Sequence, residues 1–199
     1  MLHSQNNEAE VLLSRYNGVS GTLLSIGEND GQNLSNAFDL IWHGFQAVLI
    51  EPAPTAFAKL QELHKNNKGV YCFDIAIADS NGDRVFFDSD SHLRNGDTSL
   101  LSTLIKSETN RWNNTQKFNE INVSAVDFKT FMKFSPIHHF DFISIDAEGF
   151  DLIILKQMDL KELGVDSICI EHNSNKEVMA EIIDYCAFYG LTKELLNNR

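Results

Sequence analysis

The stretch LLSIGENDGQN, residues 23–33, decides the fold. An apolar run with the character of a buried strand ends in a loop that contains Gly27 and Gly31, and the residues after it have the apolar spacing of a helix. A strand, a glycine loop and a helix in this order are typical of nucleotide-binding α/β proteins, which hold phosphates on backbone N–H groups. This loop also carries Glu28 and Asp30, whose carboxylates would repel a phosphate.

The alternation of strands and helices continues along the chain. QAVLIEPAP predicts a second strand, TAFAKLQELHKNN a second helix with Thr55 as N-cap, and VYCFDIAIAD a third strand. Further on, FDFISIDAEGFDLIILKQM predicts a strand that turns into a helix at Gly149, and DSICIEHN predicts another strand. Because these strands are apolar on both faces, we expect an α/β fold with a mostly parallel central sheet and helices on both of its faces.

Length and composition limit the possible classes of protein. The 199 residues predict a single domain, 1–199, with an N-terminal helix within residues 1–18. The net charge of −12 argues against a nucleic-acid partner, and no apolar run approaches the roughly 20 residues that a membrane span needs. Three cysteines without a CxxC pair and an N-terminus without signal-peptide character predict a cytoplasmic protein with buried thiols.

The segment after the third strand breaks the alternation. The Asn81-Gly82 pair lies between two strand-like runs and predicts a hairpin. The polar stretch that follows, residues 89–120, shows weak periodicity, and a segment of this length within a compact domain is typical of a lid or an acceptor-binding insertion. Trp112 in this stretch could stack on a flat acceptor or pack the segment down, whereas Trp42 in the first predicted helix is expected in the core.

Acidic residues follow every predicted strand of the central sheet. They occur in the segments Gly27-Glu28-Asn29-Asp30-Gly31, Glu51-Pro52, Asp74-Ile75, Asp146-Ala147-Glu148-Gly149 and Glu171-His172-Asn173. Ligands of open parallel sheets bind beyond the carboxyl ends of the strands, and a pyrophosphate would find almost no positive partner there. S-adenosylmethionine fits better, because it has no phosphate and carries a sulfonium and an ammonium group.

The positions of these acids suggest roles in binding such a cofactor. Glu51 lies 24 residues after Gly27, close to the spacing of about 20 residues at which an acid meets ribose hydroxyls. Asp74 could accept a hydrogen bond from the adenine amino group with Ile75 beside the ring, or it could be only a loop residue. Gly27 and Gly31 would let the backbone approach the ligand closely.

Methyl transfer from a sulfonium is an in-line displacement, which needs an aligned nucleophile and, if that nucleophile is a hydroxyl, a base that takes its proton. The candidates are Asp146, Glu148 and His172. His172 has the unperturbed pKa best suited to a base at neutral pH, whereas Glu148 is expected at the start of a helix, where the dipole would favour the ionised form and make it a weaker base. Asp146, Glu148, Glu171 and Asn173 could also hold Mg²⁺, but their spacing does not require a metal and none is predicted.

Five segments resemble the FkbM-type family of S-adenosylmethionine-dependent methyltransferases, namely GENDGQN, LIEPAP, IAIADSNGD, TSLLS and FDFISIDAEGFDLIIL. The resemblance extends over about residues 21–173. It implies a Rossmann-like class I methyltransferase fold with a seven-stranded sheet, and methylation of a hydroxyl on a small-molecule or carbohydrate-like acceptor. It places the methionine end of the cofactor near residues 27–31, the ribose on Glu51 and the transfer centre near Asp146 and Glu148. The expected cofactor-binding residues are Ser25, Gly27, Glu28, Asn29, Gly31, Glu51, Pro52, Asp74, Ile75 and Asp146.

The chain departs from the family pattern at three places. Ser25 stands where the family has an acid two residues before its first glycine, and Glu28 stands where an alanine follows that glycine. Glu28 could replace the lost charge, or the cofactor could bind differently or more weakly. The tail, GLTKELLNNR, leaves room for at most one short strand of the usual final hairpin. Two alternative functions therefore remain, a nicotinamide-dependent oxidoreductase and a non-catalytic S-adenosylmethionine-binding domain.

Overall fold

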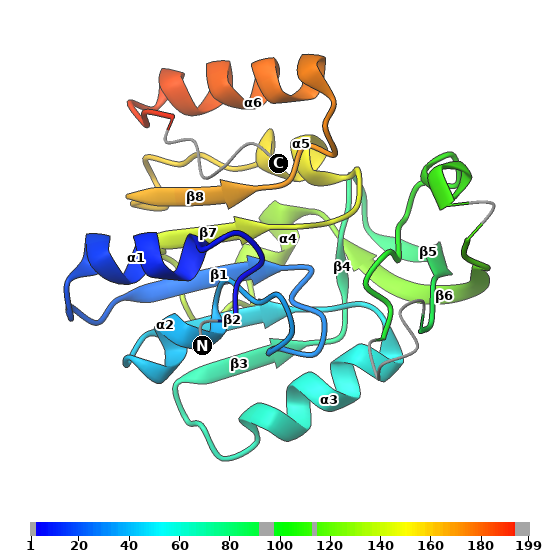
Figure 1. The fold of residues 1–199 in the computed structure, drawn as a ribbon, viewed down its shortest axis with the longest axis horizontal. Helices are drawn as coiled ribbons and strands as arrows, with labels where there is room; N and C mark the ends of the chain where they lie inside the picture. Colours follow the sequence, from blue (N-terminus) through cyan, green and yellow to red (C-terminus); the bar gives the residue numbers. More distant parts are fainter. Residues whose placement is uncertain (1–2, 92–97, 113–114, 194–199) are drawn as a thin grey trace.

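The central sheet has five parallel strands in the order β3-β2-β1-β7-β8 (Figure 1). The computed structural model describes residues 3–91, 98–112 and 115–193. The strands are β1 (Thr22–Ile26), β2 (Gln46–Ile50), β3 (Val70–Phe73), β7 (Phe142–Ile145) and β8 (Ser167–Ile170). The chain runs outward from β1 to β3 and then returns to the other side of β1, so the strand order reverses between β1 and β7. This reversal is the topological switch point at which ligands of open α/β sheets bind.

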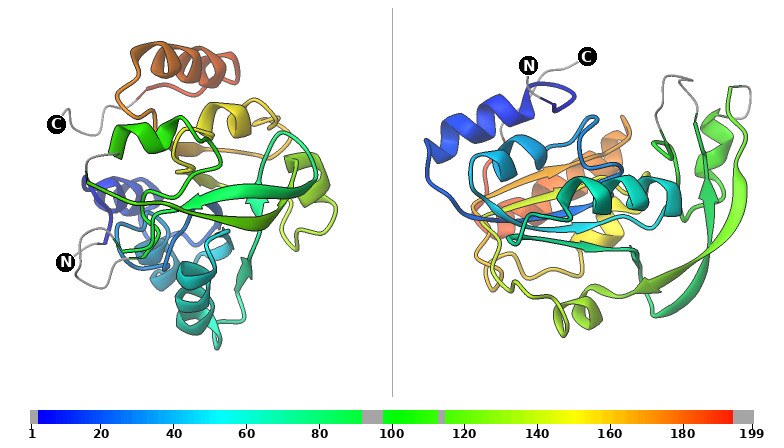
Figure 2. Two further views of the ribbon diagram at one scale, coloured as in Figure 1. Left: turned by 90° about the vertical axis from the view of Figure 1, so that its right-hand side faces the viewer. Right: turned by 90° about the horizontal axis from the view of Figure 1, so that it is seen from below.

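Each face of the central sheet carries its own layer of helices, which confirms the predicted fold class. Alternate residues of the same strands point to opposite faces, so Leu23 and Leu49 pack on one face while Leu24 and Ile50 pack on the other. The first face is covered by α1 (Glu8–Tyr16), α2 (Phe38–Trp42) and α3 (Pro54–His64), and the second by α4 (Phe128–Met132), α5 (Asp151–Leu155) and α6 (Lys176–Phe188). Figure 2 shows these two layers from the side.

The helix starts follow local capping chemistry. Asp127 precedes α4 and its side chain accepts a hydrogen bond from the Thr130 N–H at 2.6 Å, and Asn175 caps α6 in the same way. The predicted N-cap Thr55 is wrong. Helix α3 begins at Pro54, whose fixed φ and missing N–H suit the first helical position, so Ala53 takes the cap position without a side-chain hydrogen bond.

A second, smaller sheet lies beyond the carboxyl ends of the central strands (Figure 1). It contains β4 (Ala76–Ile77), β5 (Gly82–Asp88) and β6 (Asn119–Val126) in the order β4-β6-β5. The predicted third strand is thus divided, because the chain leaves the central sheet after Phe73. The predicted hairpin at Asn81-Gly82 is also wrong, since β5 pairs antiparallel with β6 while β4 pairs with β6 in parallel.

The described part of the chain differs from expectation in two further ways. Within residues 3–91, 98–112 and 115–193 the central sheet has five strands, not the seven implied by the family resemblance. Residues 194–199, on which a last short strand would partly fall, lie outside the described residues. Trp42 is 81% exposed, so its predicted place in the core is wrong. Helix α2 ends at this residue, which leaves its side chain beyond the packed part of the helix.

Residues 98–112 lie between β5 of the small sheet and the loop that follows β7 of the central sheet. Thr103 forms a bridge with Phe87 of β5 through two backbone hydrogen bonds of 2.9 and 3.1 Å. The segment ends in a short 3-10 helix, η1 (Glu108–Trp112). None of the described helices is long and apolar enough to cross a membrane. All three cysteines are free thiols.

Candidate active site

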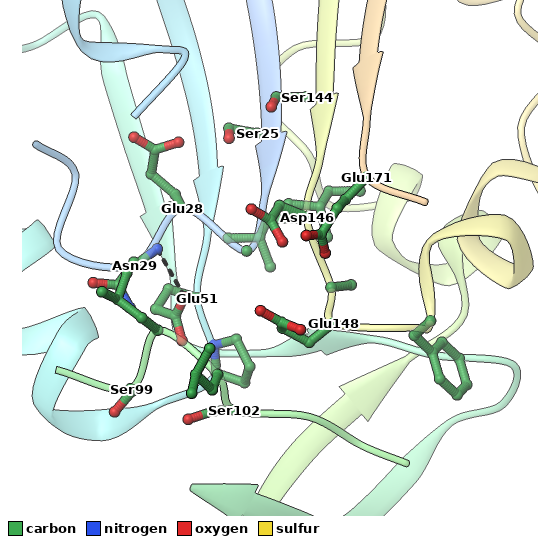
Figure 3. A pocket seen from close by; sticks show the side chains of 18 of the residues that line it. Ser25, Glu28, Asn29, Glu51, Ser99, Ser102, Ser144, Asp146, Glu148 and Glu171 are labelled. Atoms are coloured by element: carbon green, nitrogen blue, oxygen red, sulfur yellow. Dashed lines mark hydrogen bonds between the residues drawn. The ribbon is translucent and has the colours of Figure 1, made fainter. Parts of the chain in front are cut away.

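A cavity of about 430 Å³ lies over the carboxyl ends of β1, β2 and β7, at the switch point of the sheet. A volume of this size falls within the range of small-molecule and cofactor sites. The glycine loop, the ends of β2 and β7 and the segment of residues 99–112 form its walls. In Figure 3, the labelled carboxylates face the cavity from both sides.

Gly27 allows the ends of three strands to converge beneath the cavity. Its N–H donates to the Ile50 carbonyl at 2.9 Å, and its φ of +80° lies in the left-handed region. A Cβ atom at this position would lie 1.7 Å from the carbonyl oxygen of Asp146. Any side chain here would therefore push β1 and β7 apart.

Asp30 and Gly31 hold the loop in shape and do not line the cavity. The Asp30 carboxylate accepts hydrogen bonds from the backbone N–H groups of Gln32 and Asn33 at 3.0 and 2.8 Å. A Cβ on Gly31, whose φ is +80°, would lie 2.5 Å from the Leu60 side chain, so this glycine allows the loop to pack on α3. Of the two acids in the loop, only Glu28 faces the cavity.

Glu28 is a buried acid on the cavity wall, with 4% of its surface exposed. The Ser35 hydroxyl donates a hydrogen bond of 2.5 Å to its carboxylate. Burial raises the pKa of Glu28 to about 7, and the Asp30 charge adds to the rise while hydrogen bonds from Ser25 and Ser35 oppose it. The Glu28 carboxylate points toward the side of the cavity where Ser25 and Ser144 lie (Figure 3).

Glu51 lies on the cavity wall beside Pro52, immediately after β2. Its two carboxylate oxygens accept hydrogen bonds from the N–H groups of Asn29 and Ala53, at 2.8 and 2.7 Å. Burial raises the pKa of Glu51 to about 7 despite these hydrogen bonds. Each oxygen keeps a second lone pair with which it can accept a hydrogen bond from a hydroxyl group.

The predicted adenine-binding pair is divided by the structure. Ile75 lines the cavity, whereas Asp74 is exposed and is not part of the cavity wall. The two residues connect β3 to β4, and successive side chains of extended backbone point in opposite directions. A hydrogen bond from Asp74 to an adenine remains a prediction.

Three carboxylates form a cluster at the ends of β7 and β8. One oxygen of each of Asp146, Glu148 and Glu171 lies within 4.8 Å of the others, and Figure 3 shows the three side chains facing one another. Protein surrounds Asp146 closely although its carboxyl is accessible from the cavity, and this burial, together with the charges of Glu171 and Glu148, raises its pKa well above the ordinary value. The three oxygens could together bind a cation. That the site works without a metal ion remains a prediction.

Glu148 differs from the sequence-based expectation, because it does not lie at the helix start. Helix α5 begins at Asp151, whose carboxylate accepts the N–H groups of Ala147 and Gly149 at 2.8 and 2.9 Å. Asp151 therefore occupies the helix N-terminus and fixes the loop. Burial, with the charge of Glu171, raises the pKa of Glu148 to about 8, so its predicted weakness as a base is wrong.

His172 follows Glu171 in the turn after β8. It is not among the residues that line the cavity, and its carbonyl accepts the Asn175 N–H in this turn. Its Nδ1 atom is buried without a hydrogen-bond partner among the described residues. A catalytic role for His172 remains a prediction.

Residues 98–112 of the polar segment line the cavity and are attached to the glycine loop and to the loop after β7. The Asn29 side-chain amide donates to the Thr98 carbonyl at 2.6 Å, and the Thr103 hydroxyl donates to the Glu148 carbonyl at 2.8 Å. The segment also brings Arg111 to within 3.8 Å of the Glu148 carboxylate and places Trp112 on the cavity wall. Its role as a lid remains a prediction.

Sequence reasoning missed several residues that shape the cavity. They are Ser35, Asn36, Arg111, Ser144 and Asp151. Asn36 donates to the Ser144 hydroxyl at 3.2 Å across the sheet face, and Arg111 reaches Glu148 from the 3-10 helix η1. The sequence could have indicated Ser35 only as a serine that caps a helix. Its hydroxyl accepts hydrogen bonds from the N–H groups of Ala37 and Phe38 at the start of α2.

The strand order, the glycine loop and the acidic cavity at the switch point define a Rossmann-like α/β protein of the methyltransferase class. Residues 25–191 match the methyltransferase FkbM domain. The match covers most of the 199 residues, and the chain belongs to the FkbM methyltransferase family. Comparison with curated proteins found no match.

Proposed function

We propose that this methyltransferase uses S-adenosylmethionine and methylates a hydroxyl oxygen of a small-molecule or carbohydrate-like acceptor. The observation that carries the proposal is the charge of the cavity at the switch point. Five acids line it, namely Glu28, Glu51, Asp146, Glu148 and Glu171, and among the described lining residues Arg111 is the only arginine, lysine or histidine. Such a cavity attracts a cationic cofactor and disfavours a phosphate.

The residues present fit the cofactor. Gly27 keeps the loop open where a Cβ would collide with the end of β7, and Ile75 offers an apolar surface to a base. The Glu51 carboxylate would accept hydrogen bonds from the ribose hydroxyls, and the glycine loop would bind the methionine end of the cofactor. Burial raises the pKa values of Glu28 and Glu51, and neither acid has a cationic partner among the residues described, which a cationic ligand would supply. When bound, the sulfonium supplies an electrophilic methyl group.

Glu148 is the base that we favour for the acceptor hydroxyl. It lines the cavity beside Trp112 and Arg111, on the side that residues 98–112 form. A pKa of about 8 matches a proton acceptor that works near neutral pH better than an ordinary carboxylate does. Asp146, which lies between Glu148 and the glycine loop, would orient the hydroxyl or the cationic part of the cofactor. Trp112 would stack on a flat or sugar-like acceptor.

The oxidoreductase alternative fits the cavity less well. A nicotinamide dinucleotide would bring a pyrophosphate to the N-terminal side of the glycine loop, where Glu28 is buried and Glu51 is close. Neither charge has a lysine or arginine beside it among the lining residues described. The pyrophosphate would have to be desolvated against two acids, which is unfavourable.

Calorimetric titration with S-adenosylhomocysteine tests the cofactor assignment. We expect micromolar binding by the wild type and at least a tenfold loss, about 1.4 kcal/mol, in Glu51→Ala. Exposed Glu62 on α3 gives the matched control Glu62→Ala, which should bind as the wild type does. Binding of NAD without binding of S-adenosylhomocysteine would overturn the proposal in favour of an oxidoreductase.

A transfer assay separates an enzyme from a non-catalytic binding domain. The protein is incubated with S-adenosylmethionine labelled in its methyl group and a panel of hydroxylated small molecules, sugars and amines. The proposal expects label in an acceptor at a rate that Glu148→Gln lowers by at least a hundredfold. Cofactor binding with no transfer to any hydroxyl acceptor, and label on nitrogen acceptors instead, would contradict O-methylation.

A further inference from the structure

Glu28 is a carboxylate buried on the cavity wall, and in the part of the chain that the structure describes no basic side chain forms an ion pair with it. Its described hydrogen-bond partner of 2.5 Å is the neutral hydroxyl of Ser35, and a second hydroxyl, that of Ser25, also stabilises the ionised form. An acid that is 4% exposed needs charge compensation or must give up its charge. A cationic group of a ligand would provide that compensation.

A second buried acceptor lies on the same wall. The side-chain oxygen of Asn36 is buried and lacks a hydrogen-bond partner among the described residues, while the amide nitrogen donates to Ser144 at 3.2 Å. Ser144 pairs with Ser25 across β1 and β7, and Ser25 contributes to holding Glu28. A carboxylate and an unpaired carbonyl oxygen thus border one polar part of the cavity and await a donor.

The two acceptors differ from the rest of the acidic cavity. Glu51 already accepts two backbone N–H groups, and Asp146 and Glu148 face each other and Glu171 about the end of β7. Arg111 approaches Glu148, whereas among the described residues no lysine, arginine or histidine forms an ion pair with Glu28. The ligand group that binds beside Glu28 and Asn36 must therefore bring its own positive charge and several N–H donors, as a primary ammonium group does.

We infer that Glu28 and the side-chain oxygen of Asn36 bind the α-ammonium group of the cofactor. Glu28 would thereby take the place of the acid that the family pattern has at the position of Ser25. This inference rests on the proposed use of S-adenosylmethionine. Ser25 lies in β1 with its hydroxyl beside the Glu28 carboxylate. The negative charge that the strand lacks at position 25 is therefore present nearby, on the loop residue Glu28.

A pair of ligands isolates the ammonium group. S-adenosylhomocysteine carries the amino-acid part, whereas 5′-methylthioadenosine has the same adenine, ribose and thioether but no ammonium. Calorimetric titration of both into the wild type and into Glu28→Gln is expected to show at least a tenfold loss of affinity for S-adenosylhomocysteine and a change of less than twofold for 5′-methylthioadenosine. An equal effect on both ligands, or no effect on either, would overturn the inference.

A relocated acid keeps the test decisive if Glu28→Gln does not fold. The double variant Ser25→Asp/Glu28→Ala returns the carboxylate to the strand and removes it from the loop. We expect the double variant to bind S-adenosylhomocysteine more tightly than the single variant Glu28→Ala does. It should also regain most of the wild-type preference for S-adenosylhomocysteine over 5′-methylthioadenosine. A double variant that binds 5′-methylthioadenosine normally but has lost this preference would contradict the exchange of positions.

The same titrations distinguish a failure of this inference from a failure of the proposed function. If the wild type binds neither adenosine ligand, the cofactor assignment itself is wrong. If the wild type binds both ligands with equal affinity, the cofactor assignment stands and the ammonium receptor is absent. Asn36→Ala gives an independent readout, since it should weaken S-adenosylhomocysteine about threefold to tenfold and leave 5′-methylthioadenosine unchanged.

Discussion

The backbone N–H of Asn29 donates a hydrogen bond of 2.8 Å to the Glu51 carboxylate, which joins the glycine loop after β1 to the end of β2. The other carboxylate oxygen accepts the N–H of Ala53 at the start of α3. One buried side chain thus fixes two walls of the cavity, in addition to its proposed contact with the ribose. Its structural role and its binding role can be separated by substitution.

Glu51→Ala should destabilise the protein, whereas Glu51→Gln should not. Alanine leaves the N–H groups of Asn29 and Ala53 without acceptors in a buried place, and we expect the free energy of unfolding to fall by about 2 to 4 kcal/mol. Glutamine keeps one acceptor oxygen and removes a buried charge, so the change should stay below about 1 kcal/mol. Urea unfolding measures both values. Equal destabilisation by the two substitutions would contradict this account.

The ligand-free protein should lose stability as the pH rises from about 5 to about 8. The pKa of Glu28 and of Glu51 is raised to about 7 in the folded protein, above an unfolded value of 4.5. The folded state therefore binds more protons than the unfolded state between these values, and the free energy of unfolding falls with rising pH, by on the order of 3 kcal/mol for each group.

Thermal unfolding across this pH range measures the effect. The double variant Glu28→Gln/Glu51→Gln should lose the share of the pH dependence that these two acids contribute, whereas the raised pKa values of Glu148 and Asp151 keep the remainder. A wild-type protein whose melting temperature is constant or rises between pH 5 and pH 8 would show that the two acids are not buried as the structure has them.

Gly27→Ala should be far more destabilising than Gly18→Ala. Both glycines have a positive φ, +80° and +79°, so both substitutions strain the backbone by a similar amount, about 1 kcal/mol. A Cβ on Gly27 would lie 1.7 Å from the Asp146 carbonyl oxygen, whereas a Cβ on Gly18 would meet nothing within 4 Å. Chemical denaturation of the two variants should differ by about 3 kcal/mol or more. Equal losses would contradict the close approach of β1 and β7.

Fluorescence of Trp112 should report on ligand binding. The chain has two tryptophans, of which Trp42 is exposed on α2 and Trp112 lines the cavity. Trp42→Phe should leave the melting temperature within about 2 °C of the wild type, because exposed side chains contribute little to stability. In this variant, S-adenosylhomocysteine should change the remaining emission. The reciprocal variant, Trp112→Phe, should show almost no change.

The sequence by itself determined the central sheet and its helical layers. The strands are runs of apolar residues and the helices have a local period, and both patterns depend on neighbours in the chain. The glycine loop, Glu51 at the end of β2, and Asp146 with Glu148 after β7 were identified in the same way, because the ends of parallel strands must meet at one edge of the sheet. The capping of α4 by Asp127 is likewise a local interaction.

Only the tertiary structure decided which of these acids face the cavity. Asp30 and Glu28 lie two residues apart, yet Asp30 bonds within its own loop while Glu28 lines the cavity, and Asp74 lies outside it. The pairing of β5 with β6, the attachment of residues 98–112 to Asn29 and Glu148, and the approach of Arg111 all join segments far apart in the chain. No local pattern encodes such contacts, because they depend on how the packed elements are placed relative to one another.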